Sequence, residues 1–168
     1  MFIHQDVFLL SKKWLEKAEK LLSSLTNLAV AGVASKRLDS GHILSAIRHS
    51  IPPKKVRIQF SRPVRVQSLD EVLLIVLRHV FSRIGFDDRT CNGWHLYGVD
   101  YCLKLRKLGL HIYVILLRIY HLSTVIKLNP LHILRSPSIL PREYRHSLNN
   151  LLSKYRGYYI HIPTTIDD

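Results

Sequence analysis

Residues 85–117 read GFDDRTCNGWHLYGVDYCLKLRKLGLHIYVILL, and this stretch decides the fold class. Apolar side chains recur in it at helical spacing, at Leu96, Val99, Cys102 and Leu103. They predict a helix over residues 94–108, which ends at Gly109 because glycine favours the left-handed conformation that closes helices. Residues 112–117 are continuously apolar and predict a buried strand. Since the helix leads directly into a buried strand, we expect an α/β protein.

The same two patterns recur on both sides of this stretch. Strand patterns occupy residues 1–3, 28–33, 55–67 and 72–77, the third being two short strands that Pro63 divides and that we expect to form a hairpin. Helix patterns occupy residues 12–25 after an expected N-cap at Ser11, residues 79–84, and residues 141–156 before Gly157. Residues 35–53 are polar and without a period, and predict a long mobile loop. We expect one mixed sheet with flanking helices and a C-terminal helix.

Length and composition indicate one globular domain. The chain has 168 residues, of which 47% are apolar and 22% charged, so it is able to bury a core. Its two cysteines, Cys91 and Cys102, are too few for a disulfide framework and favour a reducing compartment. The N-terminus lacks the features of a secretory signal, and the apolar run at 108–122 is too short and too polar to cross a bilayer. We therefore expect a cytoplasmic protein.

The charge balance predicts an anionic partner. Lys and Arg number 25 against 12 Asp and Glu, which gives a formal net charge of +13. A protein this basic attracts nucleic acid, an acidic membrane surface or phosphate-bearing small molecules such as sugar nucleotides. Peripheral contact with the inner membrane face therefore remains an open alternative.

A polar triplet, His4-Gln5-Asp6, stands where the first strand ends. Ligands of open α/β sheets bind at strand ends, and a carboxylate there can hold a divalent cation against phosphate oxygens. The simpler alternative is that Asp6 caps a turn. His121 also follows a strand, and a neutral imidazole can bind metal, although a lone histidine is more often structural. We expect Asp6 and His121 to lie close enough to share one cation.

A second group of polar residues surrounds the helix over residues 94–108. Asp100 is a candidate general base, with His95 as the substitute, but Asp100 also stands four residues before Lys104 at the spacing of a surface ion pair. Asp87 and Asp88 are candidate turn formers. A structural zinc site is not expected, because Cys91 and His95 lack a second pair of ligands.

The order and spacing of these groups resembles the second half of a family 2 glycosyltransferase of the GT-A type. HQD at residues 4–6 is similar to that family's metal-binding DxD-like triplet, and GFDD at 85–88 is similar to its GFDE segment. WHLYGVDYCL at 94–103 resembles the acceptor helix, SLDE at 68–71 also fits, and His121 stands where a metal-binding histidine follows. The resemblance covers residues 2–123.

The resemblance implies a partial GT-A fold over residues 1–127, with residues 128–168 as a helical extension of the same domain. It implies transfer of a sugar from a nucleotide sugar to a hydroxyl of a glycan or a lipid-linked acceptor. Asp6, His121 and His4 would hold Mg²⁺ or Mn²⁺, and Asp6 with Gln5 would contact the donor diphosphate. Asp100, or else His95, would remove the acceptor proton.

Two departures from the family pattern shape this expectation. Tyr97 and Gly98 stand where many members carry a Glu-Asp pair. The strands and helices that bind the nucleotide in such enzymes precede the triplet, so we expect a separate chain to supply that half. We also expect an unpaired sheet edge and little transfer by this chain alone.

Two other classes of function stay open. Interleaved Tyr and Arg at residues 144–159, together with the net charge, allow a basic nucleic-acid-binding module, although no helix-turn-helix, zinc or RNP-like pattern is present in the sequence. A catalytically inactive remnant that binds a partner protein is the third reading. Nucleic acid is the least expected of these partners.

Overall fold

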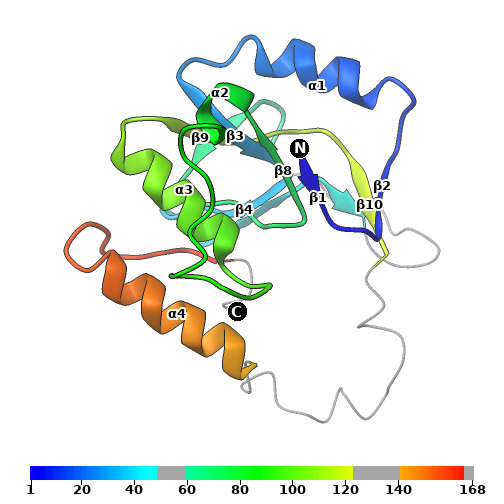
Figure 1. The fold of residues 1–168 in the computed structure, drawn as a ribbon. Coiled ribbons are helices and arrows are strands. Elements are labelled where there is room, and N and C mark those ends of the chain that lie inside the picture. The colour runs from blue at the N-terminus through cyan, green and yellow to red at the C-terminus, as the bar shows by residue number, and fades with distance from the viewer. Residues whose placement is uncertain (49–59, 123–140, 165–168) are drawn as a thin grey trace, which may run out of the picture.

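The fold is taken from a computed structural model, which describes residues 1–48, 60–122 and 141–164 (Figure 1). Its strands are β1 (Phe2–Ile3), β2 (Val7–Leu9), β3 (Leu28–Gly32), β4 (Ala34–Lys36), β5 (Ile43–Ser45), β6 (Ile47–Arg48), β7 (Val64–Val66), β8 (Leu73–Val76), β9 (His111–Val114) and β10 (Ile119–His121). Its helices are α1 (Trp14–Leu22), α2 (Arg78–Phe81), α3 (Tyr97–Lys107) and α4 (Arg142–Lys154).

The main sheet has the strand order β1-β8-β3-β9-β7. β3 and β9 run parallel, whereas β1–β8, β3–β8 and β7–β9 are antiparallel pairs. The expected α/β class with a mixed sheet is therefore confirmed. The strand predicted for residues 1–3 is confirmed as β1, which lies at one edge of this sheet.

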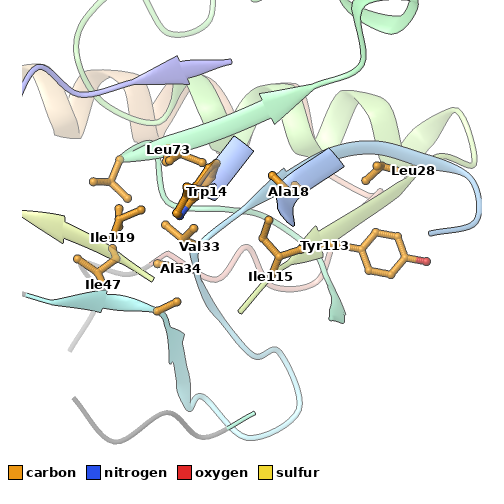
Figure 2. Close-up of a cluster of buried hydrophobic side chains, with 13 residues drawn as sticks. Trp14, Ala18, Leu28, Val33, Ala34, Ile47, Leu73, Tyr113, Ile115 and Ile119 are labelled. Carbon is orange, nitrogen blue, oxygen red and sulfur yellow. The ribbon is translucent and has the colours of Figure 1, made fainter. Parts of the chain in front are cut away.

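The central strand β3 reads LAVAG and is buried along its whole length, because helices cover both faces of the sheet. Ala31 belongs to the core cluster on the α1 side, and Val30 to the cluster on the α3 side. Figure 1 shows α1 and α3 on opposite sides of the sheet, and Figure 2 shows the α1 side, where Trp14 and Ala18 enter the core. Small side chains in β3 let both helices approach closely.

A second, three-stranded sheet of order β2-β10-β6 stands beside the main one, and β4 pairs with β5 as a hairpin. The prediction of a mobile loop over residues 35–53 is therefore wrong for its described part, which holds β4, β5 and β6. The burial of Leu44 and Ile47 at 3% and 5% exposure orders this segment. The sequence does not predict β2 and β10 either, since each is too short for a recognisable alternation.

The starts of α1 and α3 and the pairing of β7 differ from those that the sequence predicts. α1 begins at Trp14 after Lys13, so Ser11 is not its N-cap, although the Ser11 hydroxyl accepts a hydrogen bond of 3.2 Å from the Lys13 N–H. α3 begins three residues later than predicted, because Leu96 takes a left-handed backbone with φ 67°. β7 pairs with β9 and not in the expected hairpin, whose other strand begins outside the described residues.

The C-terminal helix α4 packs on α3 through a third core cluster that includes Tyr144, Leu151 and Leu103. Residues after α4 return to the sheet, where the side chains of Gln67 and Ser68 donate hydrogen bonds of 2.6 and 2.7 Å to backbone carbonyls of His161 and Pro163. α4 is thus integrated into the domain, while the boundary between 127 and 128 stays a prediction. No helix in the described ranges has the length and apolar character needed to cross a membrane.

Candidate metal centre

The three-stranded sheet β2-β10-β6, called the small sheet below, brings the His4-Gln5-Asp6 triplet and His121 together. The turn between β1 and β2 carries His4, Gln5 and Asp6, and it closes with a 3.2 Å hydrogen bond from the Val7 N–H to the His4 carbonyl. β2 pairs antiparallel with β10 in a register that sets Val7 opposite His121. The Leu122 N–H then donates to the Asp6 carbonyl at 2.9 Å. This ladder places His121 beside Asp6, although 115 positions separate them in the sequence.

The side chains of His4, Asp6 and His121 form one cluster. Each offers a ligand atom, and these atoms all lie within 4.8 Å of one another. His121 Nε2 and Asp6 Oδ1 are 3.2 Å apart, and the two imidazole rings meet edge-on with centroids 5.8 Å apart. All three residues are partly exposed, so a cation can reach them. The expected proximity of Asp6 and His121 is therefore observed, and their role as ligands stays a prediction.

A cleft opens next to this cluster. It has a volume of about 720 Å³ and is lined by residues 1–6, including Gln5, together with Trp94 and Tyr97. The indole of Trp94 is 77% exposed, which leaves an aromatic surface free beside the candidate ligands. Burial raises the pKa of Tyr97 to about 12, so its hydroxyl stays protonated near neutral pH. The aromatic wall is a feature that the sequence reasoning did not single out, although both residues stand in the WHLY stretch.

Asp100 lies elsewhere. It is only 1% exposed, it is not among the residues that line the cleft, and its carboxylate accepts hydrogen bonds of 2.7 and 2.9 Å from the Lys154 ammonium. Lys104 instead donates weakly to the Gly85 carbonyl at 3.4 Å. Both sequence expectations for Asp100, a position in the cleft and a surface pair with Lys104, are therefore wrong. In this conformation Asp100 has no access to an acceptor hydroxyl, and its assignment as the base is a prediction that the geometry disfavours.

Lys154 also binds Asp87, at 2.8 Å, so one ammonium joins α4 to two acidic residues. Although burial lowers it, hydrogen bonds to both carboxylates raise the pKa of Lys154 above its ordinary value. The hydrogen bond from Lys154 likewise holds the pKa of the Asp87 carboxyl well below its usual range. Asp87 is also the turn former that the sequence predicts, because its carboxylate accepts from the Arg89 N–H at 3.0 Å.

His95, the substitute base, follows Trp94 directly but is not among the residues that line the cleft. Its ring is partly exposed and meets the ring of Tyr144 edge-on, with centroids 5.6 Å apart. This contact with α4 covers part of the imidazole, so the side chain is not fully solvated. Its catalytic role stays a prediction.

Glu71 is a buried carboxyl group that sequence reasoning included only as part of SLDE. It packs against the first turn of α3, where an added Cβ at Gly98 would meet Glu71 Cγ at 2.8 Å. The backbone N–H groups of Gly98 and Val99 face the carboxyl group, which therefore occupies the place of the capping side chain that Leu96 does not supply. Its Oε1 atom has no hydrogen-bond partner among the described residues. Gly98 is thus explained by the close approach of Glu71.

Burial raises the pKa of Glu71 from an ordinary value of 4.5 to about 7, against the opposing effect of the backbone N–H groups. The unfolded chain ionises first as the pH rises, so folding stability contributed by Glu71 is present at low pH and is lost between about pH 4.5 and 7. We expect Glu71→Gln to become more stable relative to the natural chain by about 2–3 kcal/mol between pH 5 and pH 8. Urea unfolding at the two pH values measures this difference. Glu19→Gln on the exposed face of α1 is the control, and an equal effect of Glu71→Gln at both pH values would contradict the prediction.

Comparison with known proteins adds one relationship. No family model matches the chain. The chain is similar to a protein of Fuscovulum blasticum described as "ATP synthase subunits region ORF 6", with 28% identity over 157 residues that cover 86% of this chain and 59% of the relative. The chain thus spans about three fifths of the length of this curated relative. The relative's description states no activity. The fold and the site therefore define the chain only as an α/β protein with a candidate metal centre.

Proposed function

We propose that the chain is the metal-binding and acceptor-side part of a glycosyltransferase, which transfers a sugar from a nucleotide sugar to a hydroxyl acceptor. The observation that carries this proposal is the cluster of His4, Asp6 and His121 at the edge of an open cleft. The GFDD and WHLYGVDYCL stretches that resemble family 2 enzymes support it from the sequence side. A glycan or a lipid-linked hydroxyl is the proposed acceptor, and a separate chain is the proposed source of the nucleotide-binding half.

The ligand atoms of His4, Asp6 and His121 indicate which of the two expected cations fits better. One carboxylate and two imidazoles make a mixed oxygen and nitrogen site, whereas Mg²⁺ prefers oxygen ligands alone. Mn²⁺ accepts the mixed set, so of the two expected cations Mn²⁺ is the better match. When bound, such a cation supplies positive charge against the diphosphate that leaves the sugar.

The chain's own residues would position the reactants. The N–H of His4 donates to the Val72 carbonyl at 3.1 Å, which ties the ligand turn to the main sheet. Gln5 is exposed at the cleft and offers an amide to donor oxygens. The exposed face of Trp94 suits the apolar face of a sugar ring. For the acceptor proton we propose His95, which does not line the cleft but is partly exposed and follows the cleft residue Trp94, whereas Asp100 is buried and held by Lys154.

Titration with Mn²⁺ tests the proposal directly. We expect Asp6→Ala and His121→Ala each to weaken Mn²⁺ binding roughly 100-fold or more, since loss of even a supporting contact of a ligand costs 10- to 100-fold. Calorimetry measures the affinity, and His79→Ala, which removes an exposed imidazole from α2, is the matched control. Unchanged Mn²⁺ binding in both variants would show that Asp6 and His121 are not ligands of the cation. Two further assays test the transferase proposal: nucleotide-sugar binding in the presence of Mn²⁺, and hexosyl transfer in a mixture with a nucleotide-binding partner. The proposal is wrong if neither is detected.

The same cluster favours one second candidate. Two histidines and one carboxylate are also the ligand set of non-haem Fe(II) oxygenases. Oxygen consumption that depends on Fe(II), with no effect of nucleotide sugars, would identify that class. Salt-dependent binding of arbitrary DNA would support the nucleic-acid-binding alternative, and cation binding without turnover in any mixture would support the inactive, partner-binding remnant.

A further inference from the structure

A second cleft lies at the opposite end of the small sheet from the metal centre. Its volume is about 460 Å³. Three cationic side chains line it, Lys17, Arg48 and Arg118, with Ser11 and four apolar residues, Leu10, Trp14, Leu116 and Leu117. No carboxylate is among the described residues that line this cleft. The cleft therefore combines concentrated positive charge with an apolar floor.

The fold brings the three cations together from three separate elements. The indole N–H of Trp14 donates to the Arg118 carbonyl at 3.0 Å, which joins α1 to the start of β10. Lys17 stands one helical turn after Trp14 and so shares its side of α1. β6 pairs in parallel with β10 and sets Arg48 opposite Tyr120, two residues after Arg118. Arg118 directly precedes β10, and the side chains of both arginines line the cleft.

These charges are not neutralised by neighbouring acids. No ion pair joins Lys17, Arg48 or Arg118 to a carboxylate within residues 1–48, 60–122 and 141–164. Arg37, by contrast, has Asp39 as its partner, and Lys154 has Asp87 and Asp100. Three cations that line one cleft and have no ion-pair partner among the described residues repel one another, so an anion that bridges them gains favourable Coulomb energy from each.

The apolar floor narrows the kind of anion. Trp14 is buried below the cleft, Leu116 and Leu117 are partly exposed in it, and Leu10 is 46% exposed at its rim. Phe8 and Leu15, on the neighbouring β2 and α1, are 53% and 58% exposed. A small hydrated anion would leave this apolar surface in water. A phosphate group that is attached to an acyl or polyprenyl chain would cover it.

We propose that the Lys17–Arg48–Arg118 cleft binds the phosphate headgroup of a lipid. The site is distinct from the metal centre, because the two clefts share no lining residue and Arg118 lies three residues before His121, about 10 Å at the rise of an extended chain. It does not depend on the transferase proposal, since lipid binding requires neither a cation nor a sugar donor. In this proposal the basic chain contacts an anionic bilayer through this cleft.

Vesicle flotation tests this proposal. The probes are phosphatidylcholine vesicles with and without phosphatidic acid, and the protein is the full chain. We expect binding only with phosphatidic acid, and a roughly 100-fold loss in Lys17→Gln/Arg48→Gln/Arg118→Gln, because each cation near an anionic surface contributes about a factor of five. The control is Arg83→Gln/Arg145→Gln/Arg156→Gln, which removes the same charge from exposed sites elsewhere. Circular dichroism verifies that both triple variants are folded, and Arg118→Gln alone serves if the first is not.

Each outcome bears on the proposal. Retention of most binding by the control, with loss in the cleft variant, supports it. An equal loss in both variants shows that net charge alone drives binding and overturns it. Binding of inorganic phosphate at the cleft with no binding of vesicles overturns the lipid assignment, since the ligand is then a soluble phosphate compound.

Discussion

Lys154→Met is expected to destabilise the fold by about 3–5 kcal/mol, the cost typical of removing one partner from a buried ion pair. The variant leaves the Asp100 carboxylate, 1% exposed, without the two hydrogen bonds that Lys154 donates. It also releases Asp87 and the contact between α4 and the turn before α3. Methionine conserves the length of the side chain, so the loss of charge and not of volume dominates. Urea unfolding at neutral pH measures the effect.

A double-mutant cycle separates this effect from a general weakening of α4. Asp100→Asn in the Lys154→Met background removes the uncompensated charge, and we expect it to recover a large part of the lost stability. Lys20→Met in α1, which is exposed and has no acidic partner in the described part of the chain, is the control and should change stability by less than about 0.5 kcal/mol. A small effect of Lys154→Met, or additivity in the cycle, would show that the pair does not hold α4 in place.

Trp14→Ala is expected to cost about 3–5 kcal/mol, as large-to-small substitutions of buried aromatic residues do. Figure 2 shows Trp14 at the centre of its core cluster, among Leu73, Val33 and Ile119. The side chain is 2% exposed, and its N–H binds the Arg118 carbonyl at 3.0 Å. The substitution therefore opens a cavity and removes the link between α1 and β10.

The neighbouring Leu15 provides the control, because it is apolar but 58% exposed on the outer side of α1. Leu15→Ala should change the free energy of unfolding by about 0.5 kcal/mol or less. Trp14→Phe keeps most of the apolar contact but loses the donor, and its cost should lie between the two. Equal, small effects of Trp14→Ala and Leu15→Ala would mean that α1 does not anchor the small sheet.

The longer elements were predictable from sequence because their patterns are local. α1, α3 and α4 have apolar residues at helical spacing over at least two turns, and β3 and β8 are continuously apolar. Gly109 has φ 78°, so the end of α3 was also predictable from one residue type. The order of helix and strand was therefore enough to establish the α/β class.

The short strands of the small sheet were not predictable. β6 and β10 have two and three residues, and each is a strand because segments far away in the sequence pair with it, β10 in the case of β6, and β2 and β6 in the case of β10. In the same way, Lys154 and Asp100 are 54 positions apart, and no periodicity relates them. Asp100 and Lys104 matched a known helical spacing, yet the buried carboxylate pairs with the cation that α4 brings to it.

By itself the sequence determined the main secondary structure, the mixed α/β class and the residue types of the candidate metal centre, because propensity, periodicity and donor chemistry are properties of neighbouring residues. The tertiary structure alone decided that Asp100 is closed off by Lys154 and that Lys17, Arg48 and Arg118 share a cleft, and it supplied the proximity of His4, Asp6 and His121 that the family resemblance implied. These outcomes depend on strand register and helix docking, where the energy comes from contacts between segments far apart in the chain. A single sequence records the partners of such contacts but not their pairing.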